Sequence, residues 1–179
     1  LGFRREHIPA ITDPNSVTVP PYYPDTADVR SSIAQMYNNI HYVDQQTGTI
    51  INNLMEDDLL DNTIILWTTD HGDGFPRAKR SIYDSGIHVP LIIRDPFRMR
   101  PGTVDERLVS FVDIAPTILQ MAGAPIPSFI QGRSILSDAP RTTVFAGRDR
   151  MDETWDWQRA ARDKRFKYIR NYRPELAYF

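Results

Sequence analysis

The sequence of 179 residues contains no cysteine. Without cysteine the chain cannot form disulfides, hold a metal through thiolates or use a cysteine nucleophile. The absence does not fix the redox compartment, because a chain without cysteine is compatible with both oxidising and reducing surroundings. Any chemistry that this chain carries must therefore use other side chains.

Long apolar runs and a strong charge of one sign are missing as well. No apolar stretch approaches the ~20 residues that a membrane-spanning helix needs. The 21 basic and 23 acidic residues leave a net charge of −2, which gives no electrostatic footprint for nucleic acid. With 41% hydrophobic and 25% charged residues, the composition is that of a folded globular domain. We therefore expect neither a nucleic-acid partner nor a membrane partner.

The N-terminal end does not have the pattern of a signal peptide, because its basic residues are not followed by an apolar segment. The sequence starts at Leu1 and not at a methionine, so we expect it to be part of a longer chain. Residues 8–25 are rich in proline, which predicts an extended segment on the surface.

Two segments have the apolar spacing of helices. Residues 26–60 carry apolar side chains at intervals of three and four, which predicts a long amphipathic helix that covers a sheet. Asp25 or Thr26 is placed to cap its start, and Gly48 would bend it or split it in two. A second helix is predicted after Asp113, with Gly123 as its stop.

Short apolar runs at residues 63–69 and 89–94 predict strands. Runs without alternation are typical of parallel strands that are covered on both faces. After Pro140, residues 142–146, 158–161 and 166–170 predict short antiparallel strands with a turn at Asp163 and Lys164. The sequence therefore predicts an α/β fold, with a parallel part over residues 1–140 and a small antiparallel sheet over residues 141–179.

The strongest chemical signal follows the first of these strands. Asp70 and His71 stand where the strand ends, which is where open α/β sheets place ligands, and both can donate lone pairs to a divalent cation. Arg77, Lys79 and Arg80 follow shortly after. A cation beside fixed positive side chains is what a phosphate or sulfate group needs for binding. The alternative is ordinary turn chemistry, in which Asp70 caps its own backbone.

Two familiar motifs do not explain this loop. An EF-hand that began at Asp70 would need an acidic residue where Ser81 stands. The chain also has no phosphate-binding sequence of the form G-x-x-x-x-G-K-[ST].

A series of motifs, in order along the chain, resembles the sulfatase family. The matching segments are residues 69–72, 75–79, 83–94, 112–119, 132–136 and 161–170, with residues 19–26 upstream. The chain is most similar to the N-sulfoglucosamine sulfohydrolases (heparan N-sulfatases, or sulfamidases) and their bacterial relatives. The resemblance implies the C-terminal portion of an alkaline-phosphatase-like α/β/α sandwich, followed by a small antiparallel sheet.

The resemblance also implies roles for single residues. Asp70 and His71 match ligands of a calcium ion that holds the sulfate group and the nucleophile, and Lys79 matches a basic residue that contacts the sulfate oxygens. His7 matches a histidine that contacts sulfate or assists the leaving group, although Ile8 stands where the family has arginine. Arg80 has no counterpart in the family pattern, so we expect a solvated charge there.

Further along the chain, Arg148 and Arg150 lie in a densely charged segment. In the N-sulfoglucosamine sulfohydrolases, which this chain resembles, the matching segment approaches the entrance of the active site. By that resemblance they would hold anionic groups of a sugar, and a solvated loop is the alternative. Trp155 and Trp157 would either stack on a sugar ring or, as we expect, pack under the small sheet. We expect a structural role for His88, and for His41 a place on the surface or in packing.

The resemblance has one departure that matters for activity. The family nucleophile is a formylglycine, made from the Cys or Ser of a C/S-x-P-x-R motif, and this sequence contains neither a cysteine nor a Ser-x-Pro-x-Arg segment. The paired aspartates that complete the calcium site of the family lie nearer its amino terminus. We therefore expect a missing N-terminal half of the catalytic domain as a partner, and no turnover by these residues alone.

The function that the resemblance implies is that of a sulfatase, which removes an N- or O-sulfate from a sugar of the glycosaminoglycan type. One alternative is a phosphodiesterase or phosphatase of the same superfamily, usually with two zinc or manganese ions. Another is a non-catalytic fragment that docks onto the missing half. The resemblance implies a periplasmic, secreted or lysosomal protein without choosing among them.

Overall fold

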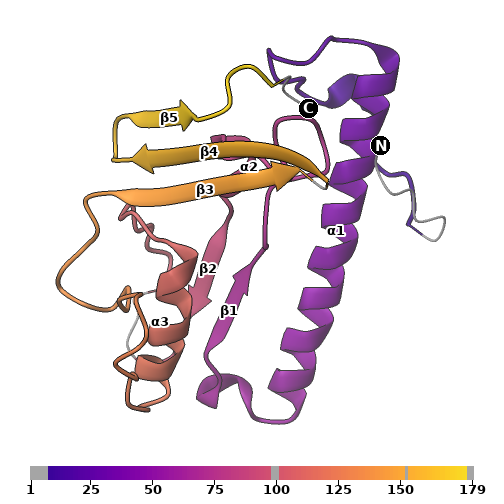
Figure 1. Ribbon diagram of the computed structural model, residues 1–179. Helices are drawn as coiled ribbons and strands as arrows, with labels where there is room; N and C mark the ends of the chain where they lie inside the picture. Colours follow the sequence, from indigo (N-terminus) through magenta and orange to yellow (C-terminus); the bar gives the residue numbers. More distant parts are fainter. Residues whose placement is uncertain (1–7, 98–100, 152, 177–179) are drawn as a thin grey trace.

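The computed structural model describes residues 8–97, 101–151 and 153–176, which form a mixed fold of helices and two small sheets (Figure 1). The helices are α1 (Ala27–Glu56), α2 (Asp84–Ile87) and α3 (Ile114–Met121). The strands are β1 (Ile65–Thr68), β2 (Leu91–Arg94), β3 (Val144–Met151), β4 (Thr154–Arg162) and β5 (Lys167–Asn171). Short 3-10 turns occupy Pro14–Ser16, Leu60–Asn62 and Phe111–Asp113. His7, a predicted site residue, lies outside the described residues.

The long helix α1 confirms the helix predicted from the apolar spacing. The Oγ1 of Thr26 accepts a hydrogen bond from the Val29 amide at 3.3 Å, so Thr26 caps its start. The helix continues through Gly48, and the predicted split there does not occur. A glycine in a helix interior costs only about 1 kcal/mol relative to alanine, which packing readily offsets. The helix ends at Glu56, earlier than predicted, and Asp58 follows with a left-handed φ of 56°.

The buried core of α1 lies near its start. Val17, Ile33 and Ala34 are buried together, and Phe75 packs against them. The buried Asn38 extends this contact, because its Oδ1 accepts hydrogen bonds from the backbone amides of residues 11 and 12 at 3.2 and 3.0 Å. The helix therefore packs against the proline-rich segment and against the loop after β1. The sequence predicted only that this helix covers a sheet and did not predict these two contacts.

Strands β1 and β2 pair in antiparallel orientation, with Ile65 opposite Arg94 and Thr68 opposite Leu91. The prediction of parallel strands was wrong for this pair. Residues 69–90 contain only the short helix α2 and bring the chain directly back along β1, whereas a parallel neighbour needs a crossover to the other end of the strand. Ile92 is 61% exposed, so the pair is not covered on both faces by the described residues.

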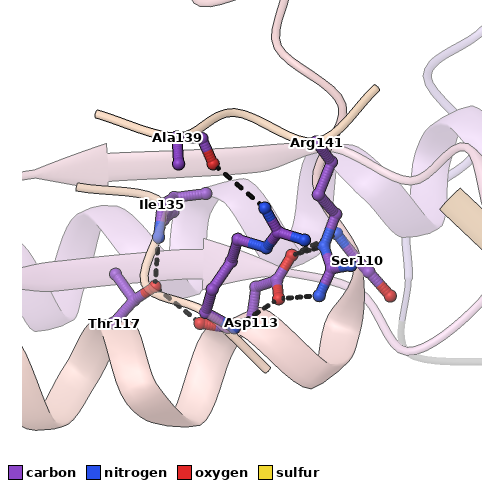
Figure 2. A network of polar contacts seen from close by, with 7 residues as sticks. Ser110, Asp113, Thr117, Ile135, Ala139 and Arg141 are labelled. Atoms are coloured by element: carbon purple, nitrogen blue, oxygen red, sulfur yellow. Dashed lines mark hydrogen bonds and ion pairs between the residues drawn. The ribbon is translucent and has the colours of Figure 1, made fainter. Parts of the chain in front are cut away.

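A buried ion pair ties the start of α3 to the segment before β3 (Figure 2). Arg141 donates to both carboxylate oxygens of Asp113 at 2.5 Å, and the Asp113 side chain is only 2% exposed. The same carboxylate accepts hydrogen bonds from the backbone amides of Ser110 and Arg133 at 3.1 and 2.9 Å. Asp113 is thus more than the helix cap that the sequence predicted. The pair crosses the predicted domain boundary at residue 140, and that boundary stays a prediction.

Burial on its own raises the pKa of Asp113, but the hydrogen bonds from Arg141 and the two backbone amides outweigh it, so the pKa is lowered. The network continues one turn into α3 (Figure 2). Thr117 donates its hydroxyl to the Asp113 carbonyl at 2.6 Å and accepts a hydrogen bond from the Ile135 amide at 3.0 Å. These contacts fix the segment after α3 against the helix.

The C-terminal strands form the small antiparallel sheet that the sequence predicted, in the order β3-β4-β5. The predicted turn is present, because the Asp163 amide donates to the Phe166 carbonyl at 3.0 Å. A bulge between Arg148 and Arg150 interrupts the β3–β4 register. Figure 1 shows the sheet at one end of the β1–β2 pair, close to α2. No helix among the described residues is long and apolar enough to cross a membrane.

Candidate functional site

The loop between β1 and β2 carries three of the predicted site residues, and close glycine contacts hold it together. The Gly72 amide donates to the Gly86 carbonyl at 2.9 Å. A Cβ on Gly72 would lie 1.8 Å from the carbonyl oxygen of Ser85, and a Cβ on Gly86 would lie 2.3 Å from two other backbone carbonyl oxygens. No side chain fits at either position, so the two arms of the loop meet backbone to backbone.

Asp70 and His71 lie at the start of this loop. The Oδ2 of Asp70 is 3.4 Å from the Nε2 of His71, and the Asp70 side chain is 84% exposed. The other ring nitrogen of His71, Nδ1, lies 2.5 Å from the Gly72 carbonyl oxygen. In the neutral tautomer that carries its hydrogen on Nδ1, the ring donates to that carbonyl and has a lone pair on Nε2, on the side of Asp70.

The donor chemistry of this pair fits part of a metal site. A backbone carbonyl that holds the far ring nitrogen is the arrangement usual for histidines that bind metals. A calcium ion takes about six to eight oxygen ligands, so one carboxylate and one imidazole cannot hold it alone. The part of the chain that the structure describes has no group of three or more His, Asp or Glu side chains that could hold a metal. The pair can therefore supply two positions of a larger ligand set.

Lys79 lies exposed on a tight turn of the same loop. Its amide donates to the Asp73 carbonyl at 2.9 Å, and the neighbouring Ala78 is completely buried. Arg77 and Arg80 have left-handed φ angles of 67° and 65°. Such angles are uncommon for residues other than glycine and persist where the surroundings enforce them. The turn thus holds Lys79 in a defined place on the surface.

Tyr23 ties the proline-rich segment to this turn. Its hydroxyl donates to the Pro76 carbonyl at 2.6 Å, and its ring centroid lies 6.0 Å from that of Phe75. Burial, and then the negative charge of Asp73, raise the pKa of Tyr23 to about 12. The phenol therefore stays protonated, and can keep donating its hydrogen bond, beyond the pH at which an ordinary tyrosine ionises.

Arg77 stacks on two aromatic rings beside this contact. Its guanidinium carbon lies 4.6 Å from the centroid of Tyr83 and 5.3 Å from that of Tyr22. The rings of Tyr22 and Tyr23 meet edge to face at 4.6 Å. From the sequence, Arg77 was one of several positive charges in the loop. The sequence offered only the presence of tyrosines as a signal, with Tyr83 in the same loop and Tyr22 in the proline-rich segment.

Asp84, at the start of α2, joins the loop to the small sheet, and sequence reasoning missed it. Arg162 of β4 contacts Asp84 at 3.0 Å, and Lys167 of β5 forms a second, closer ion pair with it. The Lys167 ammonium also donates to the Ile82 carbonyl at 2.9 Å. Burial raises the pKa of Asp84, but the hydrogen bond and charge of Lys167, with the charge of Arg162, outweigh it and lower the pKa. Nothing local in the sequence pairs residues so far apart.

The two arginines predicted to hold sugar anions lie in different surroundings. Arg148 is buried and pairs with Asp156 at 2.6 Å, and Gln158 donates to the same carboxylate at 2.9 Å. Arg150 lies beyond the bulge, exposed and opposite Trp155. The structure thus gives Arg148 a partner inside the sheet, and Arg150 is the more accessible of the two.

The expectation that Trp155 and Trp157 pack under the sheet was wrong. They are 54% and 43% exposed, and their rings meet edge to face at 6.1 Å. Alternation along β4 puts Asp156 and Gln158 on the buried face instead.

His88 is exposed, and its amide donates to the Asp84 carbonyl at 2.8 Å where α2 ends.

Two family profiles match this chain. The profile described as Sulfatase matches residues 1–124, and the profile described as N-sulphoglucosamine sulphohydrolase, C-terminal, matches residues 74–177. The chain belongs to the sulfatase family. This sulfatase-family membership confirms the resemblance seen in the motifs.

Curated sulfatases cover most of the chain. An ulvan-active sulfatase of Formosa agariphila is 46% identical over 164 residues, which span 90% of this chain and 28% of that protein. The human N-sulphoglucosamine sulphohydrolase is 29% identical over an alignment of 186 positions, which covers 96% of this chain and 37% of that protein. The chain thus spans about a third of the length of these relatives.

Solved structures of the superfamily share the fold. One, in complex with its substrate D-glucosamine-2-N,6-O-disulfate, has a TM-score of 0.71 at 27% identity and covers 84% of this chain and 34% of its own. A phosphonate monoester hydrolase from Silicibacter pomeroyi has a TM-score of 0.73 at 27% identity and covers 89% of this chain and 37% of its own. These neighbours confirm the alkaline-phosphatase-like fold class for this sulfatase-family chain.

Proposed function

We propose that the complete protein containing these residues hydrolyses a sulfate group from a sugar, and that this chain supplies part of its metal and sulfate site. The observation that carries the proposal is the placement of Asp70, His71 and Lys79 on one loop that glycine contacts lock at the end of β1. The names of relatives support the substrate class, because they include an ulvan-active sulfatase and an N-acetylglucosamine-6-O-sulfatase.

The proposed roles follow from the charge that develops during sulfate hydrolysis. Attack at sulfur increases the negative charge on the nonbridging oxygens and on the leaving atom. A calcium ion, held in part by Asp70 and His71, would supply positive charge at these oxygens. Lys79, which is exposed and has its backbone anchored through its amide, would bring an ammonium group to these oxygens. Loss of one such contact typically raises the barrier by about 3–4 kcal/mol.

Other residues have proposed roles at the edge of this site. His7 is proposed as the acid that protonates the leaving oxygen or nitrogen. Arg150, exposed on β3, is the better placed of the two arginines to hold an anionic group of the sugar, since Arg148 is already paired with Asp156.

The remaining parts of the site are proposed to come from outside these residues. The chain spans 28% and 37% of the two relatives described above. It contains no cysteine and no Ser-x-Pro-x-Arg segment from which a formylglycine could be made. We therefore place the nucleophile and the further metal ligands in another part of the protein, which packs against the loop that carries Asp70.

A second function has a specific observation in its favour. The phosphonate monoester hydrolase resembles this chain as closely as the structure with a sulfated sugar does, with TM-scores of 0.73 and 0.71. The fold therefore does not separate sulfate from phosphonate esters. An Asp-His pair at a strand end suits either anion, because both present tetrahedral oxygens to a cation.

The complete protein tests the two functions side by side. Sulfate release from glucosamine-2-N,6-O-disulfate and hydrolysis of an aryl methylphosphonate are measured at equal enzyme concentration, and bound metals are quantified by mass spectrometry. The proposal expects faster sulfate release and one calcium ion per protein. A preference for the phosphonate ester with two bound transition-metal ions would establish the second function instead. Asp70→Ala should lose the metal, and Asp44→Ala on the exposed side of α1 should keep it.

A further inference from the structure

The guanidinium of Arg77 is held by aromatic rings and not by a carboxylate. It stacks on Tyr83 at 4.6 Å and on Tyr22 at 5.3 Å. Among the described residues, no Asp or Glu side chain forms an ion pair with it. Contact with two aromatic rings restrains the position of a guanidinium, and its N–H groups stay available as hydrogen-bond donors. The arrangement therefore presents a charged fork of hydrogen-bond donors in a restrained position.

The backbone around Arg77 is fixed as firmly as its side chain. Its φ of 67° is left-handed, and its carbonyl accepts a hydrogen bond from the Ser85 hydroxyl at 2.5 Å. The carbonyl of the preceding Pro76 accepts the hydroxyl of Tyr23 at 2.6 Å. Strained backbone angles of this kind cluster at ligand-binding positions, where the surrounding contacts maintain them. Since Arg80 also has a left-handed φ, of 65°, the aromatic rings at the guanidinium of Arg77 are the feature that points to a ligand.

Arg77 is close to the position proposed for the scissile sulfate. It precedes Lys79 by two residues, so their Cα atoms are at most about 7 Å apart, and both side chains are exposed. A sugar with one sulfate at Lys79 can therefore bring a neighbouring anionic group to Arg77. The planar fork of arginine matches the paired oxygens of a sulfate or a carboxylate.

We propose that Arg77 is a substrate-binding residue that selects sugars with a second anionic group, a sulfate or a uronic-acid carboxylate, next to the sulfate at Lys79. This proposal rests on the proposed function. Tyr22 and Tyr83 act through Arg77, as positioning residues that orient its guanidinium. Arg77 thus sets specificity, whereas Lys79 contacts the group that is removed.

The experiment compares three sugars on the complete protein. They are glucosamine N-sulfate, glucosamine-2-N,6-O-disulfate, and N-sulfated glucosamine joined to a uronic acid. Dissociation constants are measured by calorimetry on the metal-loaded protein, in which the nucleophile proposed to lie outside these residues is replaced by alanine to stop turnover. Arg77→Gly is the main variant, because glycine accepts the left-handed φ. It should weaken binding of a doubly charged sugar about 10-fold or more and change binding of the singly charged sugar less than about 2-fold.

The pattern across the sugars shows which second group Arg77 binds. A loss confined to the disulfate indicates a sulfate, and a loss confined to the disaccharide indicates a carboxylate. Arg77→Lys should be intermediate, since it keeps the charge and loses the planar fork. Tyr22→Phe should bind like the wild type, because the ring that stacks is retained. Arg165→Ala removes another arginine that lies over an aromatic ring, Phe166 in the β4–β5 hairpin, and should leave the dissociation constants unchanged.

Two results would overturn the proposal. An equal loss for all three sugars would mean that Arg77 only maintains the loop, and unchanged binding would mean that it does not touch the ligand. Hydrolysis by the wild-type protein is followed separately as sulfate release. If no sugar is hydrolysed, the proposed function fails, and Arg77 is still judged on the dissociation constants alone.

Discussion

Removal of the Asp113 carboxylate should destabilise the protein far more than removal of an exposed carboxylate. The Asp113 and Arg141 side chains are 2% and 15% exposed, and Arg141 donates two hydrogen bonds of 2.5 Å to the carboxylate. Asp113→Ala would leave Arg141 as an uncompensated charge and would remove the partner of two backbone amides. Breaking a buried pair by removing one partner typically costs about 3–5 kcal/mol.

The assay is chemical denaturation followed by circular dichroism, with Asp105→Ala as the matched control. Asp105 also pairs with an arginine, Arg107, but its side chain is 54% exposed. An exposed pair contributes at most about 1 kcal/mol, so the control should lie close to the wild type. If Asp113→Ala and Asp105→Ala lower the free energy of unfolding equally, the reasoning from burial is refuted.

The same pair has a pH signature. Because the pKa of Asp113 is lowered in the folded protein, its contribution to stability is present above the ordinary carboxyl pKa and is lost as the pH falls through the lowered value. The difference in unfolding free energy between wild type and Asp113→Asn should therefore shrink as the pH falls below the ordinary carboxyl pKa of 3.8. A difference that stays constant over this range would contradict the assigned ion pair.

Three further predictions concern the loop and its attachments. Gly72→Ala should lower the free energy of unfolding by about 1–3 kcal/mol, because the new Cβ would lie 1.8 Å from a backbone oxygen. Gly74→Ala is the control and should not lower the melting temperature, because a Cβ at Gly74 would meet nothing within 4 Å. Tyr23 should ionise near pH 12 in an absorbance titration, and Tyr23→Phe should remove this late step from the titration curve. The contribution of Tyr23 to the stability of the fold is complete below pH 10.0 and is lost as the pH rises through about 12. Asp84→Asn should speed amide exchange in β5 and leave α1 unchanged; equal exchange in both would argue against Asp84 as the attachment of the small sheet.

Local patterns in the sequence predicted most of the elements, because capping, apolar spacing and turn residues act over a few positions. Thr26 at the start of α1 and the hairpin turn at Asp163 are examples that the structure confirms. The direction in which two strands pair is not set by such local patterns. The apolar runs at β1 and β2 indicated parallel strands, but the loop between them has only four helical residues and returns the chain antiparallel.

The candidate site also has features that local sequence patterns predict and features that they do not. Asp70, His71 and Lys79 were predicted from residue type, spacing and family resemblance. The structure places all three on one loop, and their roles stay a prediction. The contacts that position the loop join residues far apart in sequence, as when Asp84 meets Lys167. Such ion pairs have no sequence signal in a single chain, because any of its many exposed charges is an equally good candidate.

The central claim is that Lys79 and the Asp70 loop belong to a sulfate-hydrolysing site. The most direct test is the rate of sulfate release from glucosamine-2-N,6-O-disulfate by the complete protein, with Lys79→Ala compared with Arg80→Ala. The account predicts that Lys79→Ala lowers kcat about 10²–10³-fold, as expected for one contact to the developing charge. Arg80→Ala, the neighbouring exposed cation, should stay within a few-fold of the wild type. Equal rates for Lys79→Ala and the wild type would contradict the claim.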